Sequence, residues 1–267
     1  MSKEFPSQAQ VVIIGGGVVG CSVAYHLAEL GYADVVLLER KALTSGTTWH
    51  AAGLVGQLRA TQNLTRLAQY TTNLYANLEN LTGQATGFRQ NGSLSLATDK
   101  ERFEEMKRGA SMASCFGLEV EVITPQEAHA LYPIMSIDDL VGAVFLPRDG
   151  QTNPTDTTQA LAKGARDKGV RIFEKTKVSS LEKRDGRISA VITDKGRIAC
   201  ETVVNCAGMW GRQVGLMADV SVPLHAAEHF YVVTEPIPDL PRNLPVARSE
   251  EHTSELQSQF RISYAVF

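Results

Sequence analysis

The segment from Val11 to Arg40 constrains the fold more than any other part of the chain. Its β-branched run Val11–Ile14 predicts a strand that is buried on both faces. The run leads into Gly15-Gly16-Gly17-Val18-Val19-Gly20, and helical apolar spacing follows. A second apolar run, Val35–Leu38, predicts another buried strand and ends in Glu39. This order of strand, glycine turn, helix, strand and terminal acid is typical of a dinucleotide-binding βαβ unit.

Each residue of this motif has a physical role. Gly15 allows the tight turn, Gly17 lets a pyrophosphate approach the backbone, and Gly20 lets the helix pack closely on the sheet. The helix N-terminus offers N–H groups and a positive dipole end to phosphates. Glu39 can accept hydroxyl protons from an adenosine ribose, which disfavours NADP, although the neighbouring Arg40 weakens that inference. The alternative is a glycine-rich turn in an α/β protein that binds no nucleotide.

Composition excludes several classes of function. The net charge of −3 gives no electrostatic reason to expect nucleic acid or an anionic membrane as a partner. No apolar run approaches the roughly 20 residues that span a bilayer. The polar N-terminus lacks a signal-peptide core. The four cysteines show no metal-ligand or CxxC spacing, so we expect no metal site and a reducing compartment.

The long loop that follows Arg40 ends near Leu54, and a loop of this length in an α/β core is usually functional. Its small residues suit a ligand that extends past the pyrophosphate, such as FAD, but do not by themselves separate FAD from NAD. Apolar residues at three- and four-residue steps from Leu64 to Leu81 predict an amphipathic helix. Thr202–Cys206 reads as another buried strand, and Val222–Leu224 as a short one.

The order of these elements predicts a nucleotide domain that is interrupted by a second domain. The expected divisions are a first nucleotide-binding part, a mixed insert, a second nucleotide-binding part, the start of a second substrate-domain segment, and a tail. They cover residues 1–85, 86–146, 147–220, 221–247 and 248–267.

Four stretches resemble the amine-oxidising flavoproteins related to D-amino-acid oxidase, and most of all the sarcosine and dimethylglycine dehydrogenases. They are Ser45–Leu54, Leu131–Met135, Asp149-Gly150 with Pro154, and Val204–Trp210. The resemblance implies an α/β fold in which a Rossmann-like FAD-binding domain is interrupted by a mixed α+β substrate domain, both incomplete in this chain.

The resemblance also implies a set of cofactor-binding residues. In this family the His of the Trp-His-Ala-Ala-Gly motif carries FAD covalently through the flavin 8α carbon, and here that residue is His50. A neutral imidazole is a suitable nucleophile near pH 7. The expected FAD-binding residues are Gly15, Gly17, Val18, Val19, Gly20, Glu39, Arg40, Gly46, Thr47, Thr48, Trp49, His50, Ala51, Ala52, Gly53, Leu54, Val178 and Trp210.

His229 and Tyr231 lie where the family's chain enters the substrate domain, so we expect Tyr231, with His229, to orient the substrate; strand packing is the alternative. The implied reaction is oxidative demethylation of an N-methylated glycine, with hydride transfer to flavin N5. Electrons would pass to an electron-transfer flavoprotein, and tetrahydrofolate could take the one-carbon unit in a longer protein. Bacterial cytoplasm and mitochondrial matrix both suit this reading. The alternatives are an oxygen-using oxidase of another secondary amine or amino acid, a non-catalytic nucleotide-binding module, and a non-functional truncated fragment.

The last twenty residues do not continue the family pattern. Arg248–Ser258 resembles the in-frame translation of a sequencing-library adapter, and the continuation to Phe267 resembles the rest of it. We therefore expect Ala247 to be about the last genuine residue of an N-terminal fragment. Such a fragment would expose unpaired sheet edge and apolar surface, and we expect it to be insoluble or inactive.

Overall fold

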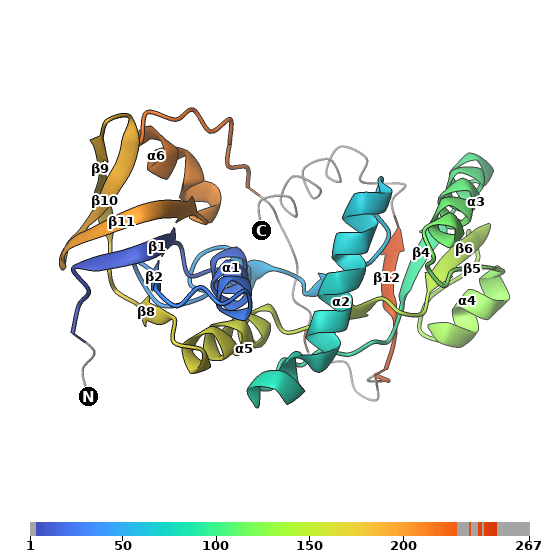
Figure 1. Ribbon diagram of the computed structural model, residues 1–267. Coiled ribbons are helices and arrows are strands. Elements are labelled where there is room, and N and C mark those ends of the chain that lie inside the picture. The colour runs from blue at the N-terminus through green and yellow to red at the C-terminus, as the bar shows by residue number, and fades with distance from the viewer. Residues whose placement is uncertain (1–3, 229–234, 236–239, 242, 250–267) are drawn as a thin grey trace.

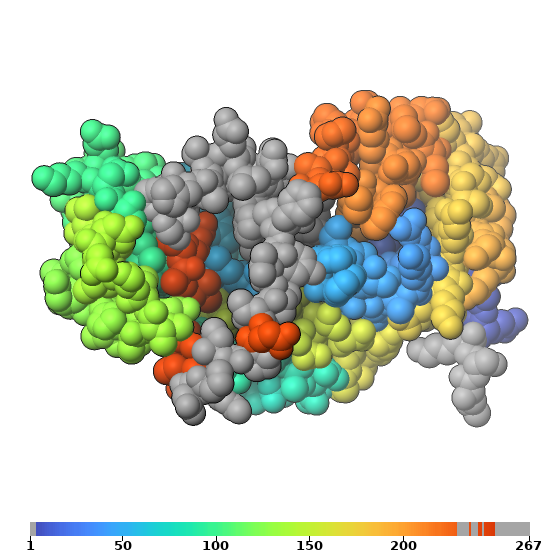
Figure 2. Space-filling model, turned by 180° about the vertical axis from the view of Figure 1, so that it is seen from behind, coloured from blue at the N-terminus to red at the C-terminus, as the bar shows by residue number. Residues whose placement is uncertain are grey.

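The computed structural model describes residues 4–228, 235, 240–241 and 243–249. These residues form two bodies along the long axis of the molecule, with helix α2 (Gln62–Thr82) between them (Figure 1). Seen from behind, the green residues of the insert and the yellow and orange residues of the nucleotide-binding part occupy opposite ends (Figure 2). No helix in the described part of the chain is long and apolar enough to cross a membrane.

A six-stranded sheet organises the nucleotide-binding body, in the order β8-β2-β1-β11-β10-β9. Neighbours are parallel from β8 to β11, whereas β9 and β10 form an antiparallel hairpin beside β11. The two apolar runs of the sequence become the two strands that are buried most completely, β1 and β2. The strands are β1 (Gln8–Ile14), β2 (Val35–Leu38), β8 (Arg171–Phe173), β9 (Val178–Arg184), β10 (Arg187–Thr193) and β11 (Gly196–Asn205).

Helices cover both faces of this sheet. On one face α1 (Val18–Glu29) and α5 (Pro154–Asp167) pack together around Tyr25 and Leu161, with Leu78 of α2 added to the same core. On the other face Val214 of α6 (Gly211–Leu216) packs with β9 and β10. The predicted Rossmann-like core is therefore confirmed.

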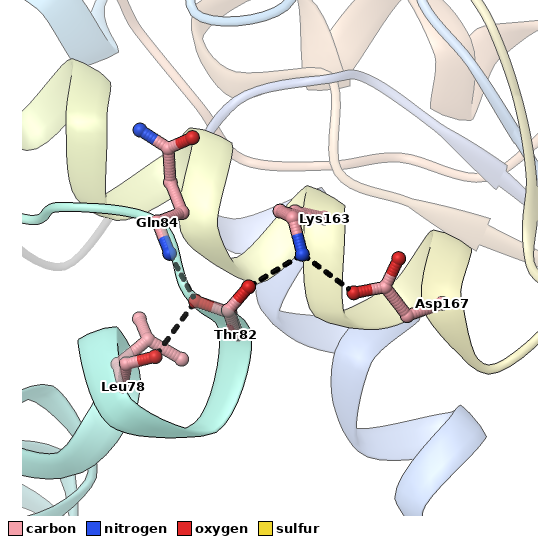
Figure 3. A network of polar contacts seen from close by, with 5 residues as sticks. All are labelled: Leu78, Thr82, Gln84, Lys163 and Asp167. Carbon is pink, nitrogen blue, oxygen red and sulfur yellow. Dashed lines mark hydrogen bonds and ion pairs between the residues drawn. The ribbon is translucent and has the colours of Figure 1, made fainter.

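The contact between α2 and α5 fixes the central helix to the nucleotide-binding body. Gly164 of α5 makes this approach possible, because a Cβ there would lie 2.7 Å from the Tyr25 ring and 3.0 Å from the Thr82 methyl. The Lys163 ammonium donates to the carbonyl of Thr82, the last residue of α2, and to the Asp167 carboxylate at 2.8 Å (Figure 3). A cation that meets a helix C-terminus satisfies an otherwise unpaired carbonyl and the negative end of the dipole.

The hydroxyl of Thr82 completes the same junction. It donates to the Leu78 carbonyl at 2.7 Å and accepts from the Gln84 N–H at 3.3 Å (Figure 3). Gly83 then ends the helix in the left-handed conformation, with φ of +66°. The end of α2 is thus held by its own side chain, by a glycine cap and by α5.

The helix predicted over Leu64–Leu81 is present, but most of its apolar stripe faces outward. Leu78 is buried, whereas Leu64, Leu67, Tyr70 and Leu81 are between 50% and 62% exposed. The inner face is built from small side chains instead, namely Thr65, Ala68, Thr72 and Thr82. Spacing identified the helix correctly, but it could not show which face of the helix is buried.

The second body is a four-stranded sheet in the order β12-β4-β6-β5, with α3 and α4 packed against it. Its elements are β4 (Ser93–Ala97), α3 (Lys100–Cys115), β5 (Glu121–Ile123), α4 (Pro125–Leu131), β6 (Gly142–Leu146) and β12 (Val246–Ser249). Strand β12 pairs in parallel with β4, so the end predicted at Ala247 falls inside a strand. A short ribbon of β3 (Leu54–Val55) and β7 (Gly150–Gln151) connects to this region.

Two strand predictions differ from the structure. Thr202–Asn205 does form the end of β11, but Thr202 and Asn205 are exposed and the two valines between them are only half-buried. The reason is the pairing: β10 reaches only Gly196–Ala199 of β11, so the later residues have a strand partner, β1, on one side only among the described residues. Val222–Leu224 is not a strand.

Candidate functional site

The principal cleft of the nucleotide-binding body lies at the carboxyl ends of three parallel strands. Ile14 of β1 is in register with Leu38 of β2 on one side and with Asn205 of β11 on the other. The segments that follow these strands enclose a cleft of about 530 Å³. Neighbouring strands that lead to opposite sides of a parallel sheet leave such a crevice, which is where open α/β sheets bind ligands.

Two glycines of the turn behave as predicted. Gly15 has φ of +115°, and a Cβ on it would lie 2.2 Å from the Cys206 carbonyl oxygen. A Cβ on Gly20 would lie 1.9 Å from the Gly15 carbonyl oxygen. Side chains at these positions would therefore push apart β1, β11 and α1. The predicted approach of a pyrophosphate to Gly17 remains a prediction, although Gly17 lines the cleft.

Glu39 holds the turn as well as lining the cleft. One carboxylate oxygen accepts from the Gly16 N–H at 2.8 Å, and the other accepts from the Lys41 N–H at 2.8 Å. A carboxylate oxygen has a second lone pair, so each can accept a further hydroxyl proton. The contact with a ribose predicted for Glu39 remains a prediction.

Arg40 and Trp210 meet across the cleft. The Arg40 guanidinium carbon lies 4.0 Å from the centre of the Trp210 ring, which is a cation–π arrangement. Trp210 ends η2 (Gly208–Trp210), the short helix that follows β11. A Cβ on Gly46 would lie 3.5 Å from the same ring, so the loop after β2 also packs against it. Residues that are distant in sequence thus close one side of the cleft.

The loop that contains the Trp-His-Ala-Ala-Gly motif leaves the cleft partway along. Thr48 begins the short helix η1 (Thr48–His50) and lines the cleft, but His50 does not. The rings of Trp49 and His50 lie with their centroids 3.6 Å apart and are tilted by 36° to each other, and both residues are exposed. Trp49 lines a second hollow of about 700 Å³, together with Arg89 and the loop that enters α5.

The structure therefore brings together part of the predicted set. The predicted residues that line the cleft are Gly15, Gly17, Val18, Val19, Glu39, Arg40, Gly46, Thr47, Thr48, Val178 and Trp210. Those that lie outside its lining are Gly20, Trp49, His50, Ala51, Ala52, Gly53 and Leu54. His229 and Tyr231, predicted to orient the substrate, lie outside the described residues.

Sequence reasoning missed several lining residues. Asn205 ends β11, Cys206 and Ala207 follow it, and the rule that ligands meet the carboxyl ends of parallel strands would have found them. Thr176 and Lys177 come from the loop between β8 and β9. The Thr176 N–H donates to the Glu39 carbonyl at 2.8 Å, a contact across 137 residues for which the sequence carries no signal.

The thiol in the cleft is not activated. Burial raises the pKa of Cys206 to about 11, so the neutral thiol is the stable form near pH 7. Among the described residues, no group of three or more His, Cys, Asp or Glu side chains is placed to hold a metal ion. The site offers backbone amides, hydroxyls and one carboxylate, which suit a phosphate- and ribose-containing ligand.

The comparisons with known proteins identify the family. The model of the family "FAD dependent oxidoreductase" (DAO) matches residues 10–261. Mouse mitochondrial sarcosine dehydrogenase is 43% identical over 97% of this chain, and rat mitochondrial dimethylglycine dehydrogenase is 41% identical over 96%. The mouse mitochondrial pyruvate dehydrogenase phosphatase regulatory subunit is 42% identical over 88%.

The chain spans 29%, 30% and 27% of the lengths of these three relatives, respectively. A solved structure, L-proline dehydrogenase from P. horikoshii, superposes with a TM-score of 0.83 and 27% identity, covering 93% of this chain and 66% of that one. The glycine turn, the cleft at the strand ends and these matches agree. The chain belongs to the DAO family of FAD dependent oxidoreductases.

Proposed function

We propose that this chain is the FAD-binding part of an enzyme that oxidatively demethylates an N-methylated glycine, either sarcosine or dimethylglycine. The observation that carries the proposal is the cleft at the strand ends in a chain 41–43% identical to sarcosine and dimethylglycine dehydrogenases. Thr48, directly before the Trp-His-Ala-Ala-Gly motif, lines this cleft. When bound, FAD supplies a hydride acceptor at flavin N5, and the N-methyl carbon of the substrate is the donor.

The residues of the cleft fit the dinucleotide end of this cofactor. The turn at Gly15–Gly17 and the first turn of α1 line the cleft, so backbone amides and the positive helix end would meet the phosphates there. Glu39 would accept the ribose hydroxyls with its remaining lone pairs. Arg40 and Trp210 would close over the adenosine end, and Val178 would pack beside it.

His50 would hold the flavin covalently. It is two residues beyond Thr48, which lines the cleft. His50 is exposed, so burial does not block access to its imidazole. A neutral imidazole near pH 7 can act as the nucleophile. Hydride loss from the substrate would leave an iminium, which water hydrolyses to formaldehyde and the demethylated amine.

Two partners complete this proposal. The electrons would pass to an electron-transfer flavoprotein. In a longer protein, tetrahydrofolate could accept the one-carbon unit. The mitochondrial names of the relatives support the matrix as one of the two expected compartments.

The test uses the protein in the form that its gene encodes. Precipitation with acid, followed by flavin fluorescence of the pellet, measures covalent attachment. Turnover of sarcosine and dimethylglycine is then followed as formaldehyde release, with an artificial electron acceptor or with oxygen alone. We expect acid-stable flavin and turnover that depends on the acceptor. Rapid reoxidation by oxygen alone would favour an oxidase instead.

A second candidate is a non-catalytic nucleotide-binding module. The 42% identity to a pyruvate dehydrogenase phosphatase regulatory subunit favours it, because that relative is named for regulation rather than for oxidation. The same assay separates the two: a regulatory module would release any flavin in acid and form no formaldehyde. A His50→Ala variant would then behave like the unmodified protein.

A further inference from the structure

The first turn of α1 has an N-cap without a side chain. Its N-cap residue is Gly17, which makes no side-chain cap hydrogen bond. The missing acceptor comes from thirty residues further along the chain, because the Val18 N–H donates to the Thr48 hydroxyl at 3.1 Å. Thr48 is only 4% exposed, so water does not readily replace this bond. Thr48 therefore caps α1 from a distance.

Gly17 leaves the space that this cap occupies. A Cβ on Gly17 would lie 3.0 Å from the Thr48 hydroxyl oxygen, which is closer than ordinary side-chain contacts. The absence of a side chain at Gly17, which is expected to let a phosphate approach, thus also leaves room for the Thr48 hydroxyl. The phosphate-binding turn and the loop after β2 are built against each other at this point.

The same threonine begins the single helical turn that carries His50. Within η1 the His50 N–H donates to the Thr47 carbonyl at 3.1 Å, and the Ala51 N–H donates to the Thr48 carbonyl at 3.2 Å. These bonds make Thr47–Ala51 one small unit. A second tether, from the Thr44 N–H to the Gly16 carbonyl at 3.0 Å, comes earlier in the same loop.

We propose that Thr48 is a positioning residue, whose hydrogen bond to the first turn of α1 sets where the His50 imidazole lies relative to a dinucleotide on that turn. The inference rests on the proposed attachment of flavin to His50. It adds that one hydrogen bond joins the phosphate-binding helix to the short helical turn that carries His50, so the same contact would position both ends of the bound dinucleotide's site.

The attachment reaction balances with dioxygen as the two-electron acceptor. A ring nitrogen of His50 forms a bond to the flavin 8α carbon, which loses one hydrogen. The ring N–H hydrogen is the second, and dioxygen takes both hydrogens and two electrons as hydrogen peroxide. Thr48 takes no part in these bonds, so its effect is on the geometry of the encounter alone.

The experiment compares Thr48→Val with Thr48→Ser in the protein as its gene encodes it. Valine keeps the shape and removes the acceptor, whereas serine keeps the hydroxyl. Thr72→Val is the matched control, because Thr72 is 1% exposed and donates to the Ala68 carbonyl at 3.0 Å within α2. Two quantities are measured: the rate at which added FAD becomes acid-stable, and the exchange rate of the Val18 amide in the FAD-free protein.

Loss of one buried hydrogen bond predicts changes of about tenfold. We expect Thr48→Val to attach FAD about tenfold more slowly and to exchange the Val18 amide about tenfold faster, with Thr48→Ser within about twofold of the unmodified protein on both. Thr72→Val should change neither. If Thr48→Val does not fold, Thr48→Ala provides the same loss of the acceptor.

One result would overturn the inference: the Val18 amide of Thr48→Val exchanges faster, but FAD attaches at the rate of the unmodified protein. Thr48 would then be a helix cap alone. An unmodified protein that holds no acid-stable flavin would instead refute the proposed function, and with it the inference. The two failures are distinguished by the unmodified protein.

Discussion

Replacement of Asp149 tests how the loop after η1 is held against the insert. Its carboxylate is 4% exposed and accepts from the Gln57 N–H at 2.9 Å, the Gln57 side-chain amide at 3.4 Å and the Ser93 hydroxyl at 2.7 Å. Asp149→Ala would leave the Gln57 N–H and the Ser93 hydroxyl buried without this acceptor. At roughly 1–3 kcal/mol for each of these two groups, we expect a loss of about 2–6 kcal/mol in the free energy of unfolding.

Asp149→Asn should cost less, about 1 kcal/mol, because the amide oxygen still accepts one bond and its NH₂ can donate to Ser93. Urea unfolding at pH 7, followed by tryptophan fluorescence, measures both losses. Asp139→Asn removes an exposed carboxylate from the same body and serves as the control. Equal, small effects of the Ala and Asn substitutions would refute the reasoning from buried hydrogen bonds.

A second prediction concerns how the stability that Asp149 contributes changes with pH. Burial raises the pKa of Asp149 above its ordinary value, although hydrogen bonds from Ser93 and Gln57 and the charge of Arg59 oppose the shift. A raised pKa in the folded state means that the protonated form is favoured by folding. The stability that protonation adds is present below the unfolded pKa and is lost as the pH rises through the folded pKa. The stability of the unmodified protein relative to Asp149→Asn should therefore increase as the pH falls from 7 to 4. A relative stability that decreases over that range would contradict the sign.

Further predictions concern the α2–α5 junction and the cleft. Lys163→Met should lower the free energy of unfolding by about 1 kcal/mol, because the contact with the α2 C-terminus is lost. Urea unfolding in low salt measures this loss, and no change would mean that the ammonium contributes nothing there. Gly164→Val should destabilise the folded protein by more than about 2 kcal/mol, because its Cβ would lie 2.7 Å from the Tyr25 ring. A melting temperature equal to that of the unmodified protein would show that the helices can separate without cost. Arg40→Ala should weaken FAD binding several-fold in a fluorescence titration, since a cation–π contact contributes about 0.5–1 kcal/mol; unchanged affinity would exclude the Arg40–Trp210 pair from the site.

The part of the fold that the sequence predicts well is the part governed by local rules. Alternation between apolar runs and glycines identifies β1, α1 and β2, because a doubly buried strand and a tight turn leave few alternatives. The steric roles of Gly15 and Gly20 follow from the same geometry, and the structure confirms them. Glu39 lies in the cleft as expected, but its bond to the Gly16 N–H is a contact that spacing does not reveal.

Errors arise where packing between distant segments decides. The inner face of α2 buries small residues such as Ala68 while Leu67 is exposed, and only at the end of the helix does Thr82 lie against Gly164 of α5. The exposure of Thr202 depends on how far β10 extends along β11, which no local pattern states. The bond between Thr48 and Val18 likewise joins two loops whose meeting only the folded chain defines.

The central claim is that a flavin lies along the glycine turn and is held by His50. The most direct measurement is flavin fluorescence of the acid-precipitated protein, made on the unmodified chain as its gene encodes it and on His50→Ala. The account predicts fluorescence in the pellet of the first and none in the pellet of the second, with FAD still bound by His50→Ala before acid. Flavin released equally by both would contradict it.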